Sequence, residues 1–318
     1  MQNKRQMGRQ DMNNRTGRKP AFRRYLTVMA GLLIMICMCM SGSVRAATVR
    51  LCDRDGKLYK TLEVTGKEKF PAVKLEARTF NGWGKAKTYR KGALYTPGER
   101  IPNADATYYM IGNSNKDIRT MGAYKMKQTK KYSQIFLVGD SRTMQMYLTI
   151  RRMLKRTTFV YGNGGGLLWF KSSGYATLLS KVRAESAKGK KKKSAVVLNL
   201  GVNDLWNVKN YISYYKKIYK DLSPLNCDLF IMSVNPIDVI RMKDGGRNLA
   251  KNATSVMTFN KKLKKGVGDR YAWVDTYSKL MESGWTTQGS VNDGGGDGVH
   301  YTKATYQRIY NFLIEAIG

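Results

Sequence analysis

The sequence predicts an α/β fold: a doubly wound parallel sheet of five strands, preceded by a small β-rich module. From Tyr132 onward, short apolar runs typical of buried strands alternate with longer helical segments, the pattern of a parallel sheet with helices on both faces. Residues 47–115 contain short β-rich runs punctuated by Gly and Pro. The 318 residues, 42% of them hydrophobic, suffice for a substantial core.

The sheet domain is expected over residues 132–318. Its predicted strands are 135–139, 157–161, 195–200, 228–234 and 271–274. The helical segments predicted to follow them are 142–155, 167–186, 208–222, 250–265 and 302–317. Right-handed crossovers arrange such strands in the flavodoxin-like order 2-1-3-4-5, with the first and third strands side by side. The loops after these two strands should therefore face one crevice.

The first predicted strand ends in a polar turn that carries Ser141. Four apolar residues precede Gly139-Asp140-Ser141, and a pattern that can start a helix follows. Ligands of open α/β sheets bind at the carboxyl ends of the strands, so Ser141 is a candidate nucleophile. A serine at such a place is more often only a helix cap, so the rest of the chain has to decide.

Three further segments lie at comparable places. A glycine run, 162–166, follows the second strand, Gly201-Val202-Asn203-Asp204 follows the third, and Asp297-Gly298-Val299-His300 precedes the last helical segment. His300 is the only histidine in the chain. In the order Ser, Gly, Asn, His, these segments resemble the SGNH (GDSL-type) hydrolase family over roughly residues 132–318.

This resemblance implies a serine hydrolase with Ser141 as nucleophile, His300 as base and Asp297 as the acid that fixes the imidazole tautomer. Ester cleavage by serine needs a base for the hydroxyl proton. His300 is the only side chain in the sequence whose ordinary pKa suits that task. Asp297, three residues earlier, can reach its other ring nitrogen.

The family's oxyanion hole has three donors, and each has a counterpart here. They are the backbone N–H of Ser141, the side-chain amide of Asn203 and one glycine N–H of the run 162–166. Glycine lets the backbone approach a substrate closely. The run leaves the register open, with Gly166 as first choice and Gly164 as second.

Several neighbouring residues receive weaker assignments. Arg142 and Asn235 are candidate substrate contacts, with a solvated role for Arg142 as the alternative. Asp140 and Asp204 are expected to brace their turns or cap the next helix. The family usually has Leu or Ile after the serine, so Arg142 is a departure that counts against lipid-like substrates.

Residues 1–46 are read as a secretory signal peptide cleaved after Ala46. A basic region precedes an apolar run of 16 residues, Tyr25 to Met40, and small residues occupy the −3 and −1 positions. An uncleaved membrane anchor is the alternative, although the run is shorter than the roughly 20 residues that span a bilayer. Cleavage would leave Cys52 and Cys227, whose pairing the sequence leaves open.

Residues 47–115 resemble one copy of the internalin-B-type (Listeria–Bacteroides) repeat, a small β-grasp-like surface module. The resemblance rests on a Phe80-Asn81-Gly82-Trp83 turn, a turn from Tyr95 to Ile101 and a closing Thr107-Tyr108-Tyr109 strand. Nothing in this module suggests catalysis. Residues 116–131, polar and rich in lysine, are read as a linker.

The chain is strongly basic, with a formal net charge of +35. Residues 1–46 carry nine Lys or Arg and one Asp, so the mature chain would keep +27. Such a surface attracts polyanions. For an exported protein, anionic cell-wall polymers are expected rather than nucleic acid. No metal or cofactor is expected, and the oligomeric state is not indicated.

The sequence therefore predicts a secreted serine esterase that removes acetyl or other small acyl groups, with carbohydrate or cell-wall polymers as the expected substrates. One alternative keeps the same site but transfers the acyl group to a sugar hydroxyl. Another is a cell-surface binding protein that uses the fold only as a scaffold. The presence of Ser141, Asn203, Asp297 and His300 together argues against the scaffold.

Overall fold

The computed structural model describes residues 45–73, 78–91, 93–114, 125–244, 251–288 and 297–318. The segment Ala46–Gly318 forms one compact unit with two hydrophobic clusters, one for each of its two sheets. The predicted signal peptide, except for residues 45 and 46, lies outside the described residues. In the described parts of the chain, no helix is long and apolar enough to cross a membrane.

The larger sheet consists of five parallel strands. They are β6 (Ile135–Gly139), β7 (Thr157–Tyr161), β8 (Ser194–Asn199), β9 (Cys227–Met232) and β10 (Ala272–Val274). Their order is β10-β9-β8-β6-β7, which is the predicted order 2-1-3-4-5 read from the other edge. The prediction of a doubly wound sheet is confirmed. β6 lies between β8 and β7, so the loops after β6 and β8 emerge side by side.

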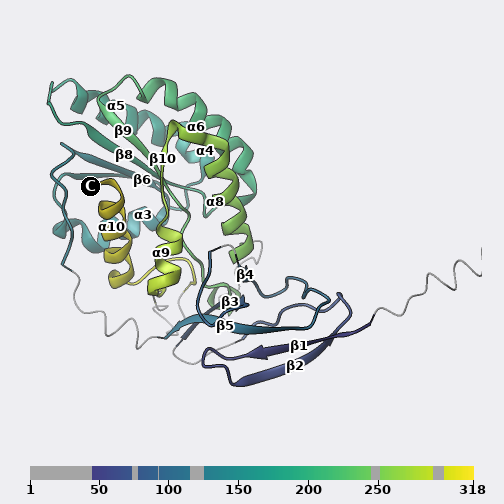
Figure 1. Ribbon diagram of the computed structural model, residues 1–318. Helices are drawn as coiled ribbons and strands as arrows, with labels where there is room; N and C mark the ends of the chain where they lie inside the picture. The colour runs from purple at the N-terminus through teal and green to yellow at the C-terminus, as the bar shows by residue number, and fades with distance from the viewer. Residues whose placement is uncertain (1–44, 74–77, 92, 115–124, 245–250, 289–296) are drawn as a thin grey trace, which may run out of the picture. The chain divides into compact units, whose positions relative to one another are not determined.

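Helices cover both faces of this sheet (Figure 1). On one face lie α3 (Ser141–Ile150), α9 (Thr276–Ser283) and α10 (Lys303–Ile317), and α10 contacts both of the others. On the other lie α4 (Leu167–Trp169), α5 (Tyr175–Ser186), α6 (Val208–Leu222) and α8 (Ala253–Val267). α7 (Val239–Asp244) follows β9. Because both faces are covered, every residue of β6 and β8 is buried, as their continuous apolar runs predict.

Three helical features differ from the prediction, and the first is α7 (Val239–Asp244), a short helix that was not predicted. α9 was not predicted, because its short sequence carries no long apolar period; Asp275 starts it by accepting the Ser278 N–H. The predicted helix 167–186 is helical throughout but changes at Phe170–Gly174 to a π-helical turn between α4 and α5. Such turns occur mostly as short interruptions of α-helices, and composition does not reveal them.

The N-terminal module is a mixed five-stranded sheet with the order β2-β1-β5-β3-β4. Its strands are β1 (Ala47–Cys52), β2 (Leu58–Val64), β3 (Arg78–Gly84), β4 (Leu94–Tyr95) and β5 (Ala106–Ser114). The β-rich module expected from the sequence is therefore present, with β1 and β5 parallel at its centre.

The Phe80-Asn81-Gly82-Trp83 motif lies inside β3 and is not a turn, which corrects the sequence reading. The register against β5 shifts between Phe80 and Gly82, so the motif forms a bulge. Gly82 has φ +144° there, and a Cβ atom would lie 2.4 Å from the Tyr95 carbonyl oxygen. Trp83 is fully buried and donates its indole N–H to the Pro71 carbonyl.

Residues 125–131 of the predicted linker lie along α10, whereas 115–124 are outside the described residues. Lys127 donates its backbone N–H to Asn311, and its ammonium pairs with Glu315. The Lys131 ammonium donates to the Ile317 carbonyl. This segment is therefore attached to the sheet domain. Cys52 and Cys227 are both buried and unpaired, so the described chain has no Cys52–Cys227 disulfide.

Candidate active site

Ser141 stands where β6 passes into α3. Asp140 is the N-cap of that helix, and its carboxylate accepts the Arg142 N–H at 2.9 Å. Ser141 is the first residue of the helix and is 5% exposed. The first N–H groups of a helix have no acceptor within it, and the helix dipole favours negative charge at this end. The position suits both a nucleophile and an oxyanion donor.

Ser141, His300 and Asp297 form a hydrogen-bonded chain. The distance from His300 Nε2 to Ser141 Oγ is 2.9 Å, and that from His300 Nδ1 to Asp297 Oδ2 is 2.5 Å. The imidazole and the carboxylate are only 16% and 21% exposed. The fold thus brings together a serine and a histidine that are 159 residues apart in the sequence.

Asp297 is held in its ionised form. Burial by itself would raise its pKa, but hydrogen bonds from the His300 ring and from the N–H groups of His300 and Val299 lower the pKa well below its usual range. An ionised carboxylate only accepts hydrogen bonds, so Nδ1 must carry the imidazole proton. Nε2 then has a free lone pair directed at the Ser141 hydroxyl, which is the tautomer a general base needs.

The loop that carries His300 is fastened to the loop after β9. Gly298 has φ +70°, and a Cβ atom there would lie 2.3 Å from the Asp238 carbonyl oxygen. The Asp238 N–H donates to the Gly298 carbonyl at 2.8 Å. Glycine at this position therefore allows the two backbones to come into contact, and the contact fixes the turn between Asp297 and His300.

Asn203 lies in the loop after β8, and two contacts fix its amide. Its Nδ2 donates to the Gly165 carbonyl at 2.9 Å, and its Oδ1 accepts from the Lys251 ammonium at 3.3 Å. A carbonyl only accepts and an ammonium only donates, so both contacts assign the same orientation of the amide. Among the described residues, no acceptor takes the second Nδ2 proton, so it can donate to a substrate oxygen. Lys251 could not be singled out from the sequence, because it is one basic residue among many.

The structure distinguishes the glycines of the run 162–166 by whether their N–H could face a substrate. Gly165 donates its N–H to the Gly162 carbonyl, so it has none left for a substrate. Among the described residues, no protein acceptor takes the N–H of Gly164 or Gly166. The hydrogen bond from Asn203 to Gly165 brings Gly166 beside the loop that carries Asn203. Gly164, by contrast, is exposed and has φ +66°. Of the two N–H groups, that of Gly166 therefore lies nearer to the loop of Asn203.

Asp204 braces this loop, as expected from the sequence. Its carboxylate accepts the Leu167 N–H at 2.9 Å and the Tyr211 hydroxyl at 2.6 Å. It packs so closely on Gly166 that a Cβ atom there would meet it at 2.8 Å. Asp204 therefore caps the start of α4 from a separate loop and holds the glycine run against the loop of Asn203.

The expectation that Arg142 contacts substrate is corrected. Its side chain is 4% exposed and donates to three carbonyls, those of Val299, Asn235 and Pro236, at 2.9–3.0 Å. The guanidinium also stacks on the Tyr301 ring, 4.8 Å from its centroid. Arg142 thus ties the start of α3 to the loop of His300.

The weaker expectation that Asn235 contacts substrate is also corrected. Asn235 is 2% exposed, its Oδ1 accepts the Thr276 hydroxyl at 2.6 Å, and its carbonyl accepts from Arg142. Its predicted place at the carboxyl edge of the sheet was right. Burial by α9, which the sequence did not reveal, removes its side chain from solvent.

Asp140 lies in the same buried layer. Burial raises its pKa to about 6, against the lowering effects of Arg142, His300 and Lys251. Its carboxylate serves the turn by capping α3, and it is not one of the groups in contact with Ser141 Oγ.

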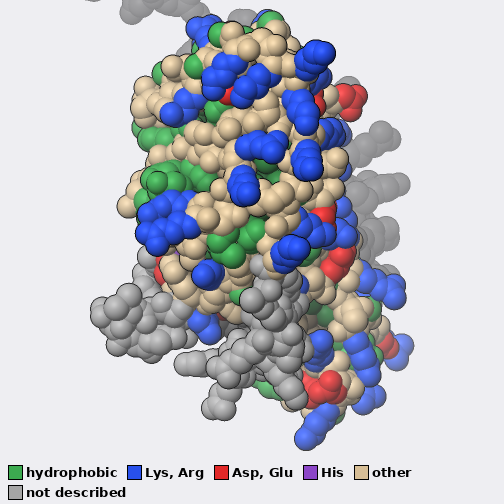
Figure 2. Space-filling model, turned by 90° about the vertical axis from the view of Figure 1, so that its left-hand side faces the viewer, with side chains coloured by type: hydrophobic (Ala, Val, Ile, Leu, Met, Phe, Trp, Pro, Cys, Tyr) green, Lys and Arg blue, Asp and Glu red, His purple; other side chains and the backbone are tan. Residues whose placement is uncertain are grey.

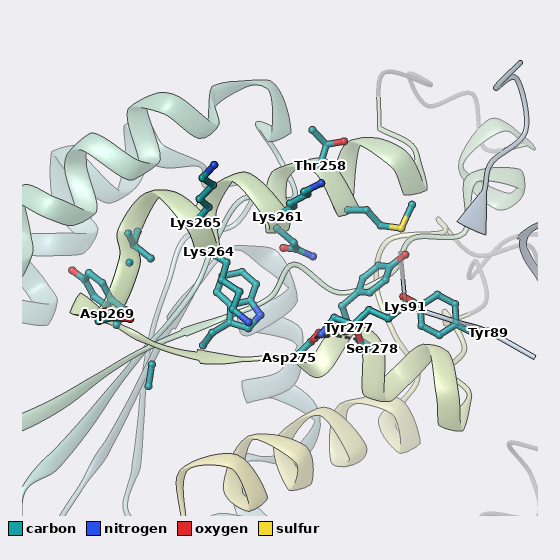
Figure 3. Close-up of a pocket in the computed structure, with 17 residues that line it drawn as sticks. Tyr89, Lys91, Thr258, Lys261, Lys264, Lys265, Asp269, Asp275, Tyr277 and Ser278 are labelled. Atoms are coloured by element: carbon teal, nitrogen blue, oxygen red, sulfur yellow. Dashed lines mark hydrogen bonds and ion pairs between the residues drawn. The ribbon is translucent and has the colours of Figure 1, made fainter. Parts of the chain in front are cut away.

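A separate cavity of about 1040 Å³ lies between α8, β10 and α9 (Figure 3). Lys261, Lys264 and Lys265 line it from α8, and the half-buried Trp273 lines it from β10. None of the residues of the Ser141–His300–Asp297 chain lines this cavity. The cavity is a concave surface with a basic wall.

No protein-family model matches the sequence, and the search of curated proteins found no match to it. Solved structures do show similarity. They include a protein assigned to the SGNH hydrolases from Slackia heliotrinireducens, with 14% identity, a TM-score of 0.45 and coverage of 59% of this chain and 100% of that one.

Two further structures are similar at the same level. A GDSL-like lipase from Bacteroides thetaiotaomicron has 15% identity and a TM-score of 0.42, covering 63% of this chain and 93% of that one. The catalytic domain of a peptidoglycan O-acetyltransferase from Streptococcus pneumoniae has 16% identity and a TM-score of 0.37, covering 58% and 93%.

Proposed function

We propose that this protein is an SGNH-type serine esterase that hydrolyses acetyl or other small acyl esters. The observation that carries the proposal is the hydrogen-bonded chain from Ser141 Oγ through His300 to Asp297, placed beside Asn203 and the glycine run. A non-catalytic scaffold would have no use for an imidazole oriented by an ionised, half-buried carboxylate.

The residues support a two-step acyl transfer. His300 Nε2 takes the hydroxyl proton as Ser141 Oγ attacks the ester carbonyl, and Asp297 stabilises the imidazolium that forms. The Ser141 N–H, the Asn203 amide and the Gly166 N–H stabilise the oxyanion. His300 then protonates the alkoxide as it departs. Ser141 is left with the acyl group bound to its oxygen. Water, deprotonated by His300, releases the carboxylic acid and restores Ser141.

The proposal is tested with the mature protein and esters of increasing acyl length. Hydrolysis of short esters, with stoichiometric labelling of Ser141 by a sulfonyl fluoride located by mass spectrometry, is the expected result. Adding a sugar acceptor then shows how the acyl-enzyme partitions between water and hydroxyl groups. An unlabelled Ser141, together with no turnover of any ester, would show that the site is not a hydrolase.

We further propose that the protein is exported, with cleavage after Ala46, and that its basic surface binds anionic cell-wall polymers. Lys and Arg side chains are spread over the face seen in Figure 2, where carboxylates are few. The lysine wall of the Figure 3 cavity adds a concave basic surface. Attraction of this kind is screened within about 10 Å at 0.1 M salt.

Two measurements test these proposals. Mass spectrometry of the protein recovered outside the cell should give an N-terminus at Ala47, whereas an intact N-terminus supports the anchor. The mature protein should sediment with isolated anionic cell walls at low salt and be released by about 0.5 M NaCl. Protein that stays in the supernatant at low salt would contradict the wall-binding proposal while leaving the esterase proposal untouched.

A further inference from the structure

Two large apolar side chains beside the oxyanion residues are unusually exposed. Trp206 is 81% exposed and Leu168 is 80% exposed, whereas the next most exposed large hydrophobic residue among those described, Leu148, is 53% exposed. Leaving so much apolar surface in water is unfavourable, and large exposed apolar surface often marks an interaction site.

Both residues lie in short helical turns that directly follow residues of the proposed oxyanion hole: Trp206 in Leu205–Asn207 and Leu168 in α4. Trp206 follows Asn203 by three residues, which places its Cα within about 11 Å of that of Asn203. Leu168 follows Gly166 by two residues, so its Cα is within about 8 Å of that of Gly166. In each loop the preceding residue, Leu205 or Leu167, is buried and anchors the backbone.

Hydrogen bonds hold the two loops together. The Leu167 N–H donates to the Asp204 carboxylate, and the Asn203 amide donates to the Gly165 carbonyl. The turn that carries Trp206 is closed by the Asn207 N–H, which donates to the Asp204 carbonyl at 2.9 Å. Trp206 and Leu168 therefore lie on two connected segments next to Asn203 and Gly166.

We propose that Trp206 and Leu168 form a platform that binds the sugar ring of a carbohydrate ester while its acyl group lies at Ser141. This inference rests on the proposed esterase function and names its substrate class. An indole offers a flat apolar face that matches the C–H face of a pyranose, while the sugar hydroxyl groups stay in water. A long acyl chain gains mainly by being enclosed, and side chains about 80% exposed do not enclose it.

The test compares a saccharide ester with an ester that has no ring. O-acetylated xylotetraose and O-acetylated chitotetraose are the saccharide substrates, and ethyl acetate is the ringless one, all followed by acid release. Trp206→Ala should lower kcat/KM for a saccharide ester at least tenfold, mainly through KM, and at least fivefold more than for ethyl acetate. Trp206→Tyr should restore most of the loss, because an aromatic face returns.

Leu168→Ala should also lower kcat/KM more for saccharide esters than for ethyl acetate, but by a smaller factor than Trp206→Ala. Leu148→Ala is the matched control, an exposed leucine of α3 outside the proposed platform, and should leave both substrates unaffected. Equal losses on saccharide and ringless esters for Trp206→Ala would overturn the proposal, since they would indicate a structural role. Methyl octanoate is assayed in parallel as an ester with a long acyl chain, and a loss confined to it would overturn the proposal in favour of an acyl-chain site.

A binding measurement separates this inference from the esterase proposal. Unacetylated xylotetraose or chitotetraose is titrated into the Ser141→Ala protein, and tryptophan fluorescence is followed. A saturable change that is lost in Ser141→Ala/Trp206→Ala supports the platform even if no ester is turned over. Binding of neither sugar by a protein that hydrolyses ethyl acetate would overturn the platform and leave the esterase proposal standing.

Discussion

Arg142→Leu tests the role of the buried guanidinium, and it introduces a residue that the SGNH family usually has at this position. Three carbonyls would lose their donor in a buried layer. Leaving one buried acceptor unsatisfied costs about 1–3 kcal/mol. The variant no longer buries a positive charge, and the energy saved offsets part of the loss from the three carbonyls. We expect a net loss of about 3–5 kcal/mol, the range for breaking a buried charged contact from one side.

Urea unfolding of the mature protein measures this loss. With a slope of about 3 kcal/mol/M, the upper end for small proteins, the midpoint should fall by about 1–2 M. Activity should fall as well, because the Arg142 contact to Val299 holds the residue next to His300. A misplacement of about 1 Å in such a site can cost roughly 100-fold in rate.

Two further variants complete the test. Arg142→Lys should recover only part of the stability, since an ammonium lacks the planar fork that reaches three carbonyls. Arg152→Leu, an exposed arginine beyond α3, should stay within about 0.5 kcal/mol of wild type. An Arg142→Leu protein within 1 kcal/mol of wild type would refute the reasoning, because the three contacts would then contribute nothing net.

Ser141→Ala and His300→Ala should each abolish ester hydrolysis, and the free energy of unfolding should stay within about 1 kcal/mol of wild type. If either variant kept more than a tenth of wild-type kcat, Ser141 would not be the nucleophile with His300 as its base. Asn203→Ala should lower kcat by roughly 10²–10³ with little change in KM, and Asn203→Asp should be at least as damaging, so a fully active Asp variant would exclude an oxyanion role. Lys251→Met should lower kcat about tenfold, equivalent to about 1.4 kcal/mol, and Lys251→Arg should restore it, whereas an unchanged Met variant would show that the Asn203 amide needs no second partner. Asp140 ionises near pH 4 in the unfolded chain but at about 6 in the folded protein, so its contribution to the free energy of unfolding should decrease by about 2–3 kcal/mol as pH rises from 4 to 6. Asp140→Asn should flatten the dependence of stability on pH in this range, measured by urea unfolding. An unchanged dependence would mean that another group causes it.

The parts of this molecule that could be predicted from sequence are those encoded by a period or an ordered motif. Buried strands such as Ile135–Gly139 are continuous apolar runs, and right-handed crossovers then leave few possible orders. The order of strands in turn explains why Ser141 and Asn203 share one edge. The resemblance to a known family supplied the pairing of Ser141 with His300.

Properties that depend on what covers a residue were not predictable. Arg142 and Asn235 follow strands that carry site residues, and only the packing of α9 and the His300 loop decides that both are buried. The Phe80–Trp83 motif contains the turn-forming Asn-Gly pair, yet cross-strand pairing with β5 makes it a bulge. Trp206 differs from expectation in the other direction. Tryptophan is usually assigned to the core from its composition alone, yet this side chain is exposed.

The contacts made by Arg142 also bear on how the protein is made. Residues 142 and 299 are 157 positions apart, and the Ser141–His300 contact spans 159. Closing loops of this size delays contact formation, and chains are synthesised from the N-terminus at about 5–20 residues per second. A nascent chain can thus form β6 and α3 well before His300 leaves the ribosome. Until His300 has been released and its loop has docked, Ser141 lacks its imidazole partner, so the proposed catalytic site is completed only late in synthesis.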